Sequence, residues 1–139
     1  MTSFRKDARG KRTRYDGVLF RSRLEARWAR HFDVVGLRWS YEPLEYRCGP
    51  YTYLPDFWMR GPDCYVEIKP DEPVTGEYWM AMNLALFSNS NLFFLVGKPG
   101  EGYCLESVWY DFPSPLLNPI YDRTVTFVEQ PYPSWLRLR

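Results

Sequence analysis

The chain has 139 residues, of which 45% are hydrophobic and 19% aromatic; this composition excludes a disordered protein and favours one globular domain. No apolar run reaches the roughly 18 residues of a membrane span, and the charged first residues lack the apolar segment of a secretory signal. Three dispersed cysteines and a single histidine, His31, disfavour a disulfide scaffold and an HExxH zinc site, so we expect a reducing, cytoplasmic setting.

The net charge of +1 hides a strong asymmetry along the chain. Residues 1–30 hold ten Lys or Arg against three acids, a net +7, and the other 109 residues hold eight against fourteen, a net −6. A basic segment ahead of an acidic body favours a polyanionic partner such as a nucleic acid. The alternative is a solvated tail that serves only solubility. We favour the nucleic acid because the charges continue from residues 1–16, expected to be a flexible arm, onto a helix.

Residues 22–35 carry the clearest helical pattern. Ser22 is a good N-cap and Gly36 a good C-terminal stop. Four apolar residues recur at helical spacing and form one stripe: Leu24, Trp28, Phe32 and Val35. Glu25 completes a capping-box pattern with Ser22, which gives its carboxylate a purely structural interpretation.

The rest of the chain predicts a sheet with a second helix. We expect strands at residues 37–46, 51–59 and 64–69, the first ending or lying at an edge because of Pro43 and the second bent or ended by Pro55. A helix at 77–89 and a continuous apolar strand at 92–96, buried and parallel to its neighbour, follow. An edge or hairpin strand at 104–110 precedes a Pro-rich, irregular wrap with one short strand at 124–129. The pattern therefore predicts a mixed α/β sheet flanked by helices.

Charged side chains gather around two of these strands. Alternation places Glu67 and Lys69 on one face of the strand at 64–69, with Val66 and Ile68 on the other. Asp56 lies eleven residues before Glu67, close enough to face it across a hairpin. Two such carboxylates can hold a divalent cation, and a neighbouring ammonium can position a water.

These residues resemble the PD-(D/E)XK nuclease superfamily. Pro55-Asp56, then Glu67-Ile68-Lys69, with Glu25 on the preceding helix, look like its motif, and residues 17–70 are most similar to phage endonuclease I-type Holliday-junction resolvases and transposase endonuclease subunits. The resemblance implies a restriction-endonuclease-like α-β-β-β-α-β core over residues 17–110, with residues 111–139 as a C-terminal extension. Taken singly, Asp56 also suits a turn, and Glu67 and Lys69 a solvated strand face.

The resemblance also implies an activity: Mg²⁺- or Mn²⁺-dependent hydrolysis of phosphodiester bonds in DNA, selective for branched or junction structures or weakly for sequence. Asp56, Glu67 and the carbonyl of Ile68 would hold one ion. Glu25 would bind a second ion or its water shell. Lys69 would orient the attacking water and neutralise charge in the transition state.

The implied partner is DNA, gripped through its backbone by a basic set on the arm and first helix: Arg12, Arg14, Arg21, Ser22, Arg23 and Arg27. A homodimer is implied by likeness to the phage resolvases, as is a host cytoplasm for a phage-encoded enzyme. Two alternatives stay open: a catalytically silent nucleic-acid-binding module, and a subunit that cuts only within a recombination complex. In the latter case residues 111–139 would dock the partner; otherwise their aromatic rings pack on the sheet.

Overall fold

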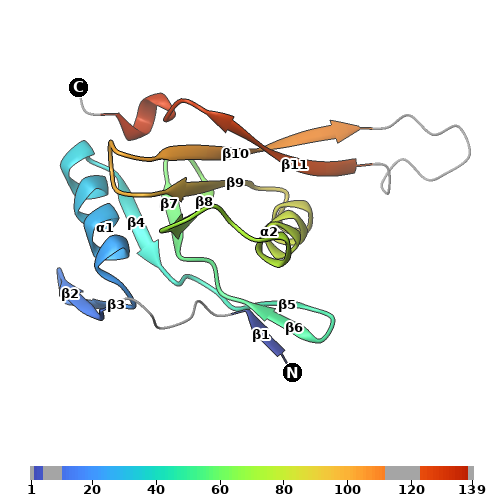
Figure 1. The fold of residues 1–139 in the computed structure, drawn as a ribbon, viewed down its shortest axis with the longest axis horizontal. Coiled ribbons are helices and arrows are strands. Elements are labelled where there is room, and N and C mark those ends of the chain that lie inside the picture. The colour runs from blue at the N-terminus through green and yellow to red at the C-terminus, as the bar shows by residue number, and fades with distance from the viewer. Residues whose placement is uncertain (1, 5–10, 112–122, 138–139) are drawn as a thin grey trace, which may run out of the picture.

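The computed structural model describes residues 2–4, 11–111 and 123–137. Its main sheet consists of six strands: β4 (Arg38–Tyr41), β7 (Phe57–Arg60), β8 (Cys64–Lys69), β9 (Asn91–Val96), β10 (Tyr103–Asp111) and β11 (Arg123–Gln130). Their spatial order is β11-β10-β9-β8-β7-β4, and every neighbouring pair is antiparallel except β8–β9. Two helices, α1 (Arg23–Val35) and α2 (Thr75–Ser88), accompany the sheet (Figure 1). The predicted mixed α/β class is confirmed.

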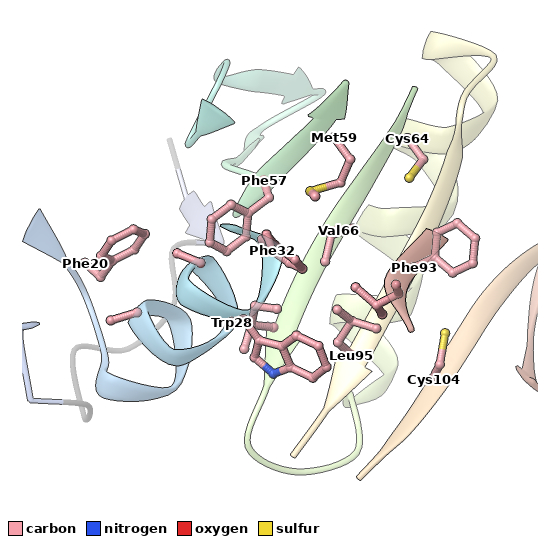
Figure 2. Packing of buried hydrophobic residues seen from close by; sticks show 14 residues of the cluster. Phe20, Trp28, Phe32, Phe57, Met59, Cys64, Val66, Phe93, Leu95 and Cys104 are labelled. Atoms are coloured by element: carbon pink, nitrogen blue, oxygen red, sulfur yellow. The ribbon is translucent and has the colours of Figure 1, made fainter. Parts of the chain in front are cut away.

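The two helices cover opposite faces of the sheet. Val66 and Ile68 of β8 belong to the same buried cluster as Trp28 and Phe32 of α1, as Figure 2 shows for Val66 and both rings. Tyr65 of β8 lies instead in the cluster that contains the buried side of α2. The predicted alternation along β8 is thus confirmed, and Glu67, one residue after Val66, lies on the α2 side.

Helix α1 begins and ends where the sequence predicts. The Ser22 side chain accepts a hydrogen bond from the Glu25 amide at 3.1 Å, and Gly36 adopts a left-handed conformation with φ of 85°. Trp28 and Phe32 are fully buried. These local signals determine the helix because the caps satisfy backbone groups that are otherwise unpaired at its ends, and the two rings bury apolar area.

The central strands also follow the prediction. β9 is buried from Leu92 to Val96 and runs parallel to β8, with Lys69 opposite Val96. The crossover between them passes through α2, as parallel strands require. β4 lies at one edge of the sheet, as Pro43 led us to expect.

The expected strand at residues 51–59 is instead two strands in two sheets. β6 (Tyr51–Tyr53) pairs with β5 (Tyr46–Cys48) and with β1 (Thr2–Phe4), while β7 joins the main sheet. Pro55 lacks an amide donor and lies at the break. The expected strand at 37–46 is likewise shorter, because residues 42–45 separate β4 from β5.

The prediction of a flexible arm over residues 1–16 is wrong at the C-terminal end of that segment. β2 (Thr13–Tyr15) pairs with β3 (Val18–Phe20), and Tyr15 packs against the core beside α1. Its hydroxyl donates to Asp33 of α1. This hairpin extends the ordered structure ahead of residue 17. Residues 5–10 lie outside the described residues.

The C-terminal part is more regular than the expected wrap. β11 forms the second edge of the sheet, so β10 is a hairpin strand but not an edge. The 3₁₀ turn η2 (Ser134–Leu136) buries Leu136 completely, and Trp135 contacts Phe93 at 5.5 Å between ring centroids. Tyr132 packs on Trp28. These rings therefore pack on the core; residues 112–122 lie outside the described part. No helix in that described part is long and apolar enough to cross a membrane.

Candidate carboxylate site

Asp56 and Glu67 meet where β7 begins beside β8. The Asp56 amide donates to Glu67 Oε1 at 2.6 Å, and the Ile68 amide donates to Asp56 Oδ2 at 2.7 Å. The register that pairs Phe57 with Val66 continues to these two residues. Both side chains are buried, with 2% and 4% of their surface exposed. The sequence prediction that they face each other across a hairpin is confirmed.

The Ile68 carbonyl lies on the same side of β8 as this pair. In a strand, the amide and carbonyl of one residue point to the same neighbouring strand. The Ile68 amide points to Asp56, whereas the next carbonyl, that of Lys69, accepts from Gly97 on the β9 side at 2.8 Å. Three kinds of oxygen, from Asp56, Glu67 and Ile68, therefore converge on one edge of β8.

Tyr53 adds a buried hydroxyl that sequence reasoning missed. The residue is 4% exposed, and its hydroxyl lies near the Glu67 carboxylate without a hydrogen bond of ordinary geometry to any described residue. Burial first, then the negative charges of Glu67 and Asp56, raise the pKa of Tyr53 well above its ordinary value. Tyr53 stands three residues before Asp56, at the end of β6 and just ahead of the break at Pro55.

Lys69 is held by Glu77, which the sequence analysis did not single out. The Lys69 ammonium donates to Glu77 Oε2, and Glu77 Oε1 accepts from the Val74 amide at 3.0 Å. Glu77 thereby caps the first turn of α2. The available signal was the place of Glu77, the third residue of the helix that follows the strand of Lys69. The contact between Glu77 and Lys69, however, depends on how the chain turns between that strand and the helix.

Glu25 lies in a separate hydrogen-bond chain at the start of α1. Its Oε1 accepts from the Tyr41 hydroxyl, which accepts from the Arg21 amide at 3.2 Å. Burial, and then the bond to Glu25, raise the pKa of Tyr41 above its ordinary value. The Arg21 guanidinium pairs with Glu42 at 2.5 Å. Glu25 is 2% exposed, so a third carboxylate is buried at this end of the molecule.

The two groups share one end of the main sheet. The Glu42 amide donates to the Asp56 carbonyl at 2.7 Å, which joins the end of β4 to the start of β7. β8 and β9 both end here, and α1 and α2 both begin here. Helix N-termini carry partial positive charge, and open α/β sheets bind ligands beyond the carboxyl ends of their strands. This end of the sheet therefore has the position in which such sheets bind ligands.

The donor set fits a hard divalent cation, although no ready cage of three side chains exists. Among the described residues, no three His, Cys, Asp or Glu side chains lie together as a metal-binding group; Asp56 and Glu67 form a pair, and Glu25 stands apart from it. Mg²⁺ is usually held by one or two carboxylates and several waters. Buried carboxylates favour a nearby cation, and the unpartnered Tyr53 hydroxyl has an unused bond for a water or ligand.

The predicted nucleic-acid contacts are spread over two elements. Arg12 lies just before β2 and Arg14 within it, and both are exposed. Arg23 and Arg27 are exposed on α1. Arg21 is half-buried and paired with Glu42, and the Ser22 side chain caps α1. The structure thus leaves four of the six predicted residues exposed to solvent.

The chain matches no family model, no curated protein and no solved structure.

Proposed function

We propose that this chain is a divalent-metal-dependent endonuclease of the PD-(D/E)XK type that hydrolyses phosphodiester bonds in DNA. The observation that carries the proposal is the reciprocal, buried pair of Asp56 and Glu67, with Lys69 two residues further along the same strand. The order α1-β4-β7-β8-α2-β9 within the sheet region supports it, because the sequence resemblance implies the same order of elements.

Each residue has a role in this proposal. Asp56, Glu67 and the Ile68 carbonyl hold Mg²⁺ or Mn²⁺, and the bound ion polarises a phosphate and lowers the pKa of a water. Glu25 acts from the side through the Tyr41 hydrogen bond, or on the water shell of an ion. The backbone bonds at 2.6 and 2.7 Å keep Asp56 and Glu67 fixed before substrate arrives, which reduces reorganisation during reaction.

Lys69 supplies the positive charge in this proposal. Its ammonium can donate to a water or to the phosphate while its ion pair with Glu77 keeps it near the carboxylates. The Glu77 carboxylate also holds the start of α2 through the Val74 amide. The lysine is therefore fastened to a rigid helix end, which restricts where its charge can act.

The substrate we propose is branched or junction DNA, cut with weak sequence preference. Exposed arginines on α1 and β2 suit phosphate contacts, and such contacts position a duplex without identifying its bases. The test is a cleavage panel of four-way junction, flap, single-stranded and duplex DNA, with Mg²⁺ or Mn²⁺ and with EDTA.

We expect Asp56→Asn and Glu67→Gln each to lower the cleavage rate by about 10²-fold or more, as does loss of one strong electrostatic stabiliser. Both changes keep the side-chain shape and remove charge. Calorimetry with Mn²⁺ on the same proteins should show weaker binding. Glu129→Gln, an exposed acid on the edge strand β11, is the matched control and should cleave normally.

Three outcomes would contradict the proposal. Wild-type cleavage rates in both variants would remove Asp56 and Glu67 from the chemistry. DNA binding without cleavage under any metal would instead favour the silent binding module, and cleavage that appears only with added partner proteins would favour a nuclease subunit.

A further inference from the structure

A basic groove lies between α1 and the loop that joins β9 to β10. Its lining includes Arg27, Arg30, His31, Lys98 and Glu101. Arg27, Arg30 and Lys98 are exposed. The groove therefore carries three permanently positive side chains and one acid, Glu101. The sequence analysis predicted a nucleic-acid contact for Arg27 but not for Lys98.

These cations are available to a ligand. Neither Arg27, Arg30 nor Lys98 forms an ion pair with another described residue, in contrast to Arg21 with Glu42 and Lys69 with Glu77. Arg27 and Arg30 are three residues apart on one helix face, where like charges repel. An anion bound between them would relieve that repulsion.

The groove has rigid walls. The Trp28 indole donates to the Gly97 carbonyl at 2.9 Å, which fastens the β9–β10 loop to α1. Within the loop, the Glu101 amide donates to the Lys98 carbonyl at 3.0 Å. His31 Nε2 lies 2.9 Å from the Leu136 carbonyl and therefore donates to it. A rigid site loses little entropy when it binds.

The groove opens near the end of the sheet that holds the carboxylates. Gly97 follows β9 directly, and its amide donates to the Lys69 carbonyl at 2.8 Å. Lys98 is the next residue. Along α1, exposed Arg23, Arg27 and Arg30 cover about 10 Å of helix axis at 1.5 Å per residue. That length exceeds one phosphate group and suits a continuous chain of them.

We propose that this groove binds the sugar-phosphate backbone of a nucleic acid on the far side of the scissile bond, with Arg27, Arg30 and Lys98 as its phosphate contacts. The inference rests on the proposed function for its choice of ligand. Guanidinium groups pair with phosphate through two parallel hydrogen bonds. The sugar-phosphate backbone would run from the carboxylates past Lys69, Gly97 and Lys98 into the groove.

The experiment measures binding of a fluorescent 20-nucleotide duplex by anisotropy in EDTA, over a series of salt concentrations. Arg27→Gln/Arg30→Gln should weaken binding and reduce the slope of log K against log salt by about 1.8, the value for two lost phosphate contacts on duplex DNA. Adding Lys98→Gln to that variant should reduce the slope by about 0.9 more. Glu101→Gln should strengthen binding.

The matched control is Arg38→Gln/Arg60→Gln. These two exposed arginines are cross-strand partners of β4 and β7, at the end of the sheet away from Asp56, and their loss removes the same charge. The control should keep the wild-type slope. Equal weakening by both double variants, or no duplex binding by the wild type, would overturn the groove proposal.

The two proposals fail in different ways. Loss of binding in Arg27→Gln/Arg30→Gln, together with absence of metal-dependent cleavage by the wild type, supports the groove and refutes the nuclease. Metal-dependent cleavage by the wild type with unchanged binding in that variant supports the nuclease and refutes the groove.

Discussion

At the scale of single residues, the Tyr53 hydroxyl stands out as the one buried side-chain oxygen or nitrogen that finds no hydrogen-bond partner in the described part of the chain. An unsatisfied buried polar group costs about 1–3 kcal/mol. Its neighbours are the carboxylates of Glu67 and Asp56. A water or a hydrated cation at the Asp56–Glu67 pair would give the hydroxyl a hydrogen-bond partner. The unsatisfied hydroxyl therefore fits the proposed ion.

Tyr53→Phe tests this link. Because the variant removes an unsatisfied hydroxyl, we expect its free energy of unfolding in EDTA to rise by about 1 kcal/mol. Excess Mn²⁺ should then stabilise it less than the wild type, since a more weakly bound ligand stabilises the folded state less. Thermal melts with and without Mn²⁺ measure both effects. Tyr65→Phe, on the same face of the sheet but with no such unpartnered hydroxyl, is the control; the same Mn²⁺ response in both variants would refute the link.

The site was partly predictable at this scale. Asp56, Glu67 and Ile68 are brought together by a hairpin whose strand period and turn are local properties of the sequence. Tyr53 and Glu77 were missed because their positions depend on the break at Pro55 and on the turn from β8 into α2. Glu25 stays a predicted ligand; the structure adds its hydrogen bond with Tyr41, a pairing between two elements that no local pattern encodes.

At the scale of elements, the start of α1 carries both structure and site. Ser22 caps the helix by accepting from the Glu25 amide, and the side chain of Glu25 bonds to Tyr41. The cap therefore fixes the backbone from which the buried carboxylate projects. The end signals of α1 were readable from sequence because capping is a contact between residues three apart.

Ser22→Ala should lower the free energy of unfolding by about 1 kcal/mol, the usual loss for a removed N-cap. Chemical denaturation measures the change. Ser22→Asn, which also caps well, should recover most of the stability. A Ser22→Ala protein as stable as the wild type would show that the bond between Ser22 and the Glu25 amide contributes little.

The strands show which element assignments fail. β8 and β9 were predicted well because their apolar patterns match their burial. The membership of β11 in the main sheet was missed, since pairing β10 with β11 depends on a partner across residues 112–122. A period of two predicts a strand but does not select the neighbour.

At the scale of the whole molecule, η2 closes the core. Leu136 is fully buried in the cluster that also contains Trp28 and Phe93. Leu136→Ala should therefore cost about 3 kcal/mol, as lost burial plus a cavity. Denaturant titration measures it, and Leu136→Met should cost far less because volume is kept. A loss under about 1 kcal/mol would place the C-terminal turn outside the cooperative core.

Buried acids predict how stability depends on pH. Burial raises the pKa of the Cys64 and Cys104 thiols to about 12, and burial raises that of Tyr46 to about 12 as well. The folded protein then keeps protons that the unfolded chain releases, so stability must fall as pH rises from about 9 to about 12. Urea unfolding at pH 8, 9 and 10 measures this; constant or rising stability over that range would contradict the burial of these groups.

The hairpin that joins β7 to β8 also bears on how the protein folds. Its turn is short and already shaped by Gly61 and Asp63, whose φ angles are 99° and 53°, whereas the β8–β9 pair must wait for α2 to cross over. Short loops close early at low entropic cost. We therefore expect Asp56 and Glu67 to approach each other early in folding, with their mutual repulsion opposing the step. An ion bound by both carboxylates would offset that repulsion and favour formation of the hairpin.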